Sequence, residues 1–149
     1  MPDVFSQEER SRIMGRVKNR DTKPELALRG ALWALGVRGW RCHRRDLPGR
    51  PDIAFGPARL AVFVDGAFWH GHPSKYKAGQ SGEFWDRKIA ENIARDSRAN
   101  VELAAIGWAV IRLWDFEVLG NPVETANRVK DRLHDLGYSR PRTSESEGA

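Results

Sequence analysis

Cysteine is nearly absent from this sequence of 149 residues, since Cys42 is the only one. A single thiol cannot form an internal disulfide, and it excludes a closed metal cluster built from several cysteines. Long apolar runs are also missing, because no stretch approaches the roughly 18 residues of a membrane-spanning helix. The opening MPDVFSQEER contains no apolar core of a secretory signal. We therefore expect a cytoplasmic protein without a membrane partner.

Positive charge, in contrast, is plentiful and unevenly placed. Residues 1–50 carry 12 Lys+Arg and 6 Asp+Glu, whereas residues 51–149 carry 13 and 14. Arginine provides 19 of the 25 cations, and its planar guanidinium matches the geometry of phosphate. The basic first third indicates a polyanionic partner such as nucleic acid, with a merely solvated basic surface as the alternative.

Capping signals and apolar periodicity predict one α/β domain with a mixed central sheet flanked by helices. The expected order is helix, helix, three strands, helix, strand, helix. The ranges are about 6–17, 22–36, 37–43, 52–55, 60–64, 84–105, 108–114 and 122–136. We divide the chain into a basic arm at 1–20, a folded domain at 21–137, and a polar tail at 138–149 that we expect to be disordered.

Two aspartates mark the ends of neighbouring strands in a predicted hairpin. Asp52 begins one strand, Asp65 ends the next, and a turn at residues 56–57 brings both to the same end of the sheet, beside the carbonyl of Val64. Carboxylate and carbonyl oxygens are the ligands that Mg²⁺ prefers. The alternative is that both aspartates are solvated strand ends.

A segment rich in aromatic and imidazole groups follows Asp65. His70 is placed to act as a general base on water beside a metal, while a zinc site formed by His70 and His72 lacks further ligands. Phe68 and Trp69 are adjacent beside a polar turn. We expect one or both rings to be exposed for stacking or wedging between bases, with a hydrophobic lid over the loop as the alternative.

Four ordered blocks resemble the very-short-patch repair (Vsr) DNA mismatch endonucleases. They are SRIMGRVKNRDTKPELALR, LPGRPDIAFGPARLAVFVDGAFWHGH, EFWDRKIAENIARDSRA and GWAVIRLWD. The resemblance covers about residues 6–136 and implies a restriction-endonuclease-like fold. It implies an Mg²⁺-dependent enzyme of the bacterial cytoplasm that nicks one strand of double-stranded DNA 5′ of the mispaired thymine in a T:G mismatch. It further implies a monomer, with a functional link to a cytosine-5 DNA methyltransferase.

The resemblance also implies roles for individual residues. The Asp52 carboxylate and the Val64 carbonyl would bind Mg²⁺, and His70 would be the general base. Glu25 would be a supporting acidic group, and we count Asp65 with it among the catalytic residues. The aromatics that match those inserted beside the mismatch are Phe68, Trp69 and Trp85. Met14 lies in the arm that clamps the minor groove, where we also place Arg16 as a DNA contact.

Zinc is the cofactor for which this chain departs from the family pattern. Relatives hold a structural zinc with cysteine and histidine ligands, but the matching positions here are Ala67, His72, Ser74 and Phe116. We predict that structural zinc is absent and that Ala67 and Phe116 pack in its place.

The alternative to an enzyme is a DNA-binding module that recognises distorted duplexes without cutting them. The joint presence of Asp52 and His70 favours the enzyme.

Overall fold

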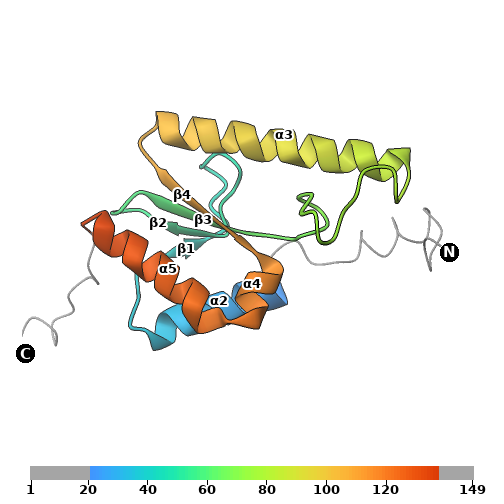
Figure 1. Ribbon diagram of the computed structural model, residues 1–149. Helices are drawn as coiled ribbons and strands as arrows, with labels where there is room; N and C mark the ends of the chain where they lie inside the picture. Colours follow the sequence, from blue (N-terminus) through green and yellow to red (C-terminus); the bar gives the residue numbers. More distant parts are fainter. Residues whose placement is uncertain (1–20, 138–149) are drawn as a thin grey trace, which may run out of the picture.

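A four-stranded mixed sheet forms the centre of the molecule, in a computed structural model that describes residues 21–137 (Figure 1). The strands lie in chain order: β1 (Arg41–Cys42), β2 (Ile53–Phe55), β3 (Leu60–Asp65) and β4 (Ala109–Trp114). The first three pair antiparallel, and β4 runs parallel to β3. The mixed sheet predicted from the sequence is therefore confirmed.

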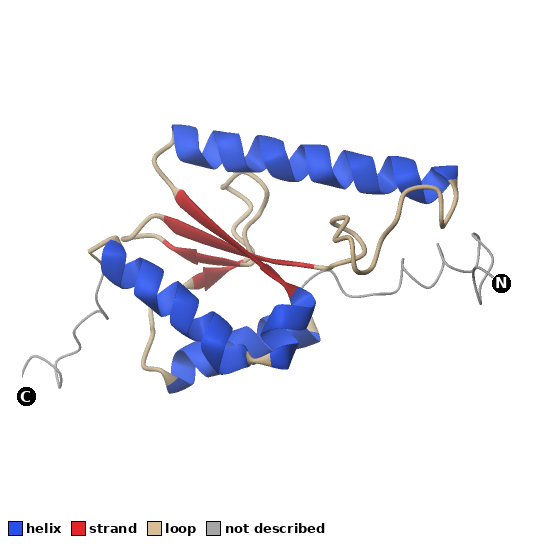
Figure 2. Cartoon of the chain, in the orientation of Figure 1, coloured by secondary structure: helices blue, strands red, loops and turns tan. Residues whose placement is uncertain are grey.

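Helices lie on both sides of this sheet (Figure 2). The long helix α3 (Glu83–Ala105) lies along one face, and it makes the connection that a parallel β3–β4 pair requires. The helices α2 (Lys23–Ala34), α4 (Asp115–Gly120) and α5 (Pro122–Asp135) lie on the other face. This layered arrangement confirms the small restriction-endonuclease-like α/β domain expected from the sequence.

Alternation along the strands divides the apolar core between the two faces. Successive side chains of a strand point to opposite sides. Leu60 and Val62 pack in the cluster that contains residues of α2 and α5, whereas Ala61 and Phe63 pack with Leu103 of α3. Burial on both faces explains why β3 reads as a continuous apolar run.

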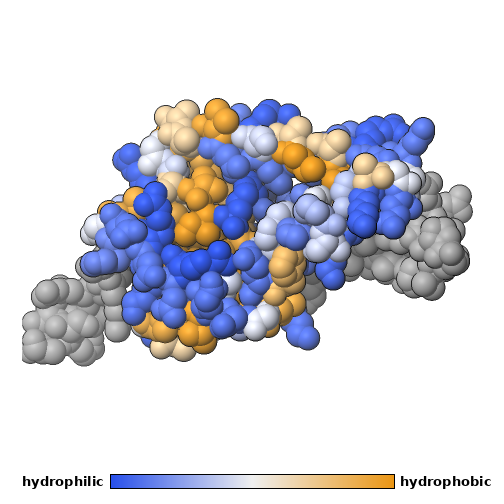
Figure 3. Space-filling view, viewed as in Figure 1, coloured by the Kyte–Doolittle hydropathy of each residue, from blue (hydrophilic) through white to orange (hydrophobic). Residues whose placement is uncertain are grey.

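Strand β4 is an edge of the sheet. Five of its six residues are only partly buried. Figure 3 shows apolar side chains gathered between α3 and α5, in the region that β4 occupies in Figure 1. The described helices include none that is both long enough and apolar enough to cross a membrane.

Two elements differ from the sequence-based ranges. The strand expected over 37–43 is only two residues long, because Gly39 and His43 on either side of it have positive φ angles of 89° and 53°. Helix α4 was not expected. It begins where Oε1 of Glu117 accepts a hydrogen bond from the backbone N–H of Trp114 (3.0 Å), which satisfies one donor at the helix N-terminus.

Three predictions concern segments outside the described residues. These are the basic arm at 1–20, the helix expected within it at 6–17, and the tail at 138–149. Met14 and Arg16 lie in that arm, so their assignment to the minor groove stays a prediction.

Candidate active site

A cavity of about 760 Å³ opens where the start of β2 and the end of β3 face α3. Its walls include most of the candidate site residues: Glu25, Asp52, Val64, Asp65, Trp69 and His70. Strand alternation accounts for much of this lining, because Asp52, Asp65 and Arg112 each lie two positions from a residue packed on the α3 side of the sheet. Those packed neighbours are Ala54, Phe63 and Val110.

Asp52 and Val64 meet as the hairpin predicts. Ile53 pairs with Val62, and the backbone N–H of Val64 donates to Oδ2 of Asp52 (2.6 Å). The N–H and C=O groups of a strand residue point to the same side, so the Val64 carbonyl also faces the side of the strand on which Asp52 lies. A carboxylate and a carbonyl oxygen therefore converge at this corner of the cavity.

Asp52 is a buried acid, and its side chain is only 17% exposed. Burial raises the pKa of Asp52 to about 7. The Val64 N–H opposes this rise in pKa, the nearby charges of Glu25 and Asp65 add to it, and His70 opposes it. A cation bound beside such a carboxyl group would lower its pKa and favour the charged form.

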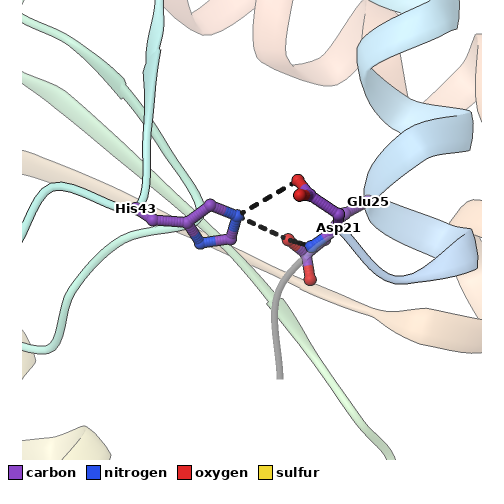
Figure 4. Close-up of side chains that lie close together, drawn as sticks. All are labelled: Asp21, Glu25 and His43. Carbon is purple, nitrogen blue, oxygen red and sulfur yellow. Dashed lines mark hydrogen bonds and ion pairs between the residues drawn. The ribbon is translucent and has the colours of Figure 1, made fainter. Parts of the chain in front are cut away.

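Glu25 has a structural partner as well as a place beside Asp52. It lies at the third position of α2, where its carboxylate accepts from the Thr22 backbone N–H (3.4 Å) and hydroxyl (2.8 Å), as in a capping box. His43 Nε2 lies 3.2 Å from Oε1 of Glu25 and 3.7 Å from Oδ1 of Asp21 (Figure 4). His43 Nδ1 lies 3.9 Å from Oδ1 of Asp52, so this imidazole lies between two acids of the site.

His70 lies on the loop after β3 with one ring nitrogen held by an acid. Its Nδ1 contacts Oδ2 of Asp96 from α3, and its Nε2 lies 3.9 Å from Oδ1 of Asp65. Burial lowers the pKa of His70, but the hydrogen bond to Asp96 and the charges of Asp65 and Asp96 raise it above the ordinary 6.5. When Nδ1 donates a hydrogen bond to Asp96, Nε2 is left as the basic nitrogen of the neutral ring.

Arg112 of β4 joins the two acids that flank His70. Its Nη1 lies 3.1 Å from both oxygens of Asp65 and 3.5 Å from Oδ1 of Asp96. Burial raises the pKa of Asp65, while His70 and Arg112 oppose the rise and Asp96 adds to it. The acids and the histidine resemble a cation site, but within the described residues the guanidinium already supplies positive charge there.

The three candidate aromatics form one cluster. The ring centroid of Trp85 lies 5.6 Å from that of Phe68 and 5.4 Å from that of Trp69. Phe68 and Trp69 are half-buried, and Trp69 lines the cavity. Trp85 is only 1% exposed, so in this arrangement it supports the other two rings and presents no surface to DNA.

The positions that match zinc ligands also come together. The Ser74 backbone N–H donates to Nδ1 of His72 (3.0 Å), and the His72 ring lies edge-on to Phe116 with centroids 4.9 Å apart. The backbone N–H of His72 donates to the carbonyl of Ala67 (2.8 Å). Ala67 is buried as expected, but Phe116 remains 40% exposed because it packs beside the His72 ring rather than beneath the loop.

Sequence reasoning missed Asp96, Arg112 and His43. A signal for Asp96 existed, because it lies seven residues from both Ile89 and Leu103, and two helical turns bring side chains back to the same face. A carboxylate in the middle of a buried stripe is a candidate for a site. Arg112 and His43 gave no comparable signal, since their partners depend on strand register and loop conformation.

Fold and site together define a nuclease of the restriction-endonuclease-like class. A model of the family described as DNA mismatch endonuclease Vsr matches residues 2–76. The chain is 40% identical over 147 residues to Type II nicking enzyme V.NmeDIP of Neisseria meningitidis serogroup C, covering 96% of this chain and 99% of the relative. It is 34% identical over 138 residues to DNA mismatch endonuclease Vsr of Escherichia coli K12, covering 91% and 87% respectively. The chain therefore belongs to the Vsr family of DNA mismatch endonucleases and is an endodeoxyribonuclease.

Proposed function

We propose that this enzyme uses Mg²⁺ to nick one strand of a DNA duplex on the 5′ side of the mispaired thymine in a T:G mismatch. One observation carries the proposal. Asp52, the Val64 backbone and the His70–Asp96 pair line or adjoin a single cavity that also borders the aromatic cluster. Metal binding, proton transfer and recognition of an unstacked base could thus occur within one site.

The residues at the Asp52 corner fit a divalent cation. Asp52 lies beside other acids, and its pKa is raised first by burial and then by the charges of Glu25 and Asp65. Its carboxylate and the Val64 carbonyl would hold Mg²⁺, with Glu25 close by. Bound Mg²⁺ would polarise the phosphate and stabilise the charge that develops on its oxygens. Hard oxygen ligands of this kind favour Mg²⁺ over softer metals.

His70 is the group that moves the proton. Nε2 takes a proton from the attacking water, and the carboxylate of Asp96 stabilises the imidazolium that results. The raised pKa of His70 supports this role, because it reflects how strongly the surrounding acids stabilise the protonated ring.

Recognition of the mispair depends on the low free energy that is needed to unstack bases at a mismatch. A mismatched base step is easier to open than a matched one, so aromatic side chains that insert there gain selectivity. Phe68 and Trp69 are the partly exposed rings beside the cavity. Three further side chains of the cavity wall are suited to phosphate contacts: Arg45, Arg50 and Arg95. We extend the proposal to a monomer that repairs mispairs left by deamination at methylated cytosines, in association with a cytosine-5 methyltransferase.

The experiment is a nicking assay with the purified full chain. Duplexes carrying T:G, the other mispairs or matched pairs, each labelled on one strand, are incubated with Mg²⁺ or with EDTA. We expect a single Mg²⁺-dependent nick 5′ of the mispaired thymine. Binding to the T:G duplex without a nick under any metal condition would favour the non-cleaving module and contradict the proposal.

Variants test which residues carry the chemistry. Asp52→Ala is expected to abolish nicking while T:G binding persists, because the metal ligand is lost and the phosphate contacts are not. His70→Ala is expected to lower the single-turnover rate by ~10²–10⁴-fold, the usual contribution of a general base. Asp131→Ala, at an exposed position of α5, serves as the control. Nicking by Asp52→Ala at the parent rate would contradict the proposed metal site.

A further inference from the structure

Arg112 is a partly buried arginine that contacts groups on two neighbouring elements. Besides contacting Asp65 on β3 through Nη1, it donates from Nε to Oδ1 of Asn100 (2.8 Å) and from Nη2 to the backbone carbonyl of Asp96 (3.4 Å), both on α3. Its Cζ lies 3.9 Å from the centroid of the Phe63 ring. The side chain is thus fixed from several directions, at the boundary between the sheet and α3.

Two carboxylates, those of Asp65 and Asp96, lie on either side of the His70 imidazole. Asp96 holds Nδ1 of His70, while Oδ1 of Asp65 lies 3.9 Å from Nε2 of the same ring. If Asp65 moved closer and accepted a proton from Nε2, that nitrogen could no longer take a proton from water. Arg112 prevents this competition, because its Nη1 engages both oxygens of Asp65.

We propose that Arg112 is a positioning residue of the nicking reaction, which holds Asp65 away from Nε2 of His70 and holds Asp96 against Nδ1. The proposal rests on the proposed function of His70 as the general base. Arg112 lines the cavity, and in this proposal it acts on the reaction through Asp65 and Asp96. Lysine would not replace it fully, because one ammonium cannot contact Asp65, Asn100 and the Asp96 carbonyl in the three directions that the guanidinium uses.

The test is a mutant cycle between Arg112 and His70, measured by single-turnover nicking of the T:G duplex and by duplex affinity. Arg112→Met is expected to lower the rate by about ten- to a hundredfold, a part of the ~10²–10⁴-fold contribution of the base. The dissociation constant should change by less than about threefold, since the lost interaction acts on the chemical step. Arg128→Met is the matched control, because Arg128 pairs with Glu117 on the helices of the opposite face.

The decisive measurement adds Arg112→Met to His70→Ala. A residue that acts through His70 has little left to affect, so the added substitution should change the rate by less than about threefold. A loss that multiplies with that of His70→Ala, or a parent-like rate for Arg112→Met alone, would overturn the proposal. If instead His70→Ala itself nicks at the parent rate, the proposed function of His70 fails and the Arg112 role fails with it.

Removing one partner of a buried ion pair can also prevent folding, so circular dichroism and urea titration accompany every variant. Arg112→Lys keeps the positive charge beside Asp65 and provides a second arm if Arg112→Met does not fold. We expect its rate to fall by about three- to tenfold and, in the His70→Ala background, to fall no further. A parent-like rate for a folded Arg112→Lys would show that charge alone suffices and would contradict the positioning role.

Discussion

Asp52 is under two opposing requirements at the scale of a single side chain. A metal ligand must be ionised, but burial and neighbouring acids raise the pKa of this carboxyl group from 3.8 to about 7. The free energy of unfolding of the metal-free protein is therefore lower at any pH where this carboxyl group is ionised in the unfolded state. The proposed role of Asp52 as a metal ligand therefore lowers the stability of the metal-free protein.

Asp52→Asn is expected to stabilise the metal-free protein at pH 8. Below pH 3.8 the carboxyl group is protonated in both the folded and the unfolded states and has no effect. As pH rises from 3.8 to 7, the unfolded state loses its proton first, so the folded state loses stability. The difference in pKa corresponds to a limit of about 4 kcal/mol, at 1.36 kcal/mol per pKa unit. Urea unfolding of both proteins at pH 5 and pH 8 should show the larger gain at pH 8.

Mg²⁺ provides the complementary control for that substitution. It should raise the melting temperature of the parent protein at pH 8, because a ligand that binds only the folded state stabilises it. Asp52→Asn should show little or no rise. An equal rise in both proteins would place the metal elsewhere.

Trp69 is the ring that we expect to distinguish mismatched from matched DNA. Trp69→Ala should narrow the difference in binding free energy between T:G and matched duplexes by ~1–3 kcal/mol, the usual contribution of stacking on one base. Fluorescence anisotropy with labelled duplexes measures both affinities. Trp33→Ala is a suitable control, since Trp33 is 59% exposed but does not line the cavity. An unchanged difference for Trp69→Ala would assign that ring to packing alone.

At the scale of elements, the sequence predicted those features that are determined by residues close together in the chain, such as helix starts and hairpin register. Pro24 and the Thr22–Glu25 pair correctly placed the start of α2, and the Gly56–Pro57 turn fixed the β2–β3 register that joins Asp52 to Val64. The partners of Arg112 could not be predicted in this way. They depend on the parallel register of β3 and β4, which is set by packing against α3 and not by any turn.

The loop before β2 contains a glycine that no other residue can replace without strain. Gly49 has a φ of 78°, and a Cβ there would lie 2.8 Å from Cβ of Ala99 on α3. Gly49→Ala should therefore destabilise the fold by about 1–3 kcal/mol. Gly30→Ala is the matched control, because Gly30 lies within α2 with open space around it. Urea unfolding should show a gain of about 0.5–1 kcal/mol for this control. A parent-like Gly49→Ala would contradict the close approach of the loop to α3.

At the scale of the whole molecule, we expect the aromatic packing around His72 to take the place of the structural zinc that the family resemblance implies. His72 lies against the rings of Trp114 and Phe116 and bonds to Ser74, so it joins the loop after β3 to the start of α4. A structural zinc normally supplies part of the folding free energy. We predict that in this chain side-chain packing holds the same segments together.

We expect purified protein to contain no stoichiometric zinc. Elemental analysis of untagged protein, prepared without chelators, should find well under one zinc per chain. The melting temperature should be unchanged by a strong zinc chelator, because removing metal affects only folds that depend on it. One tightly held zinc per chain, lost together with stability on chelation, would contradict this expectation.

The parallel pairing of β3 with β4 leads us to expect that the site is completed late in folding. The β2–β3 hairpin brings Asp52 to Val64 by contacts close in sequence, and such contacts form early in folding. Arg112 lies on β4, which follows the whole of α3 in the chain. A nascent chain thus carries Asp65 well before Arg112, the residue that contacts both of its carboxylate oxygens. We expect nicking activity to appear only when folding is nearly complete, so that partly folded chains do not nick DNA.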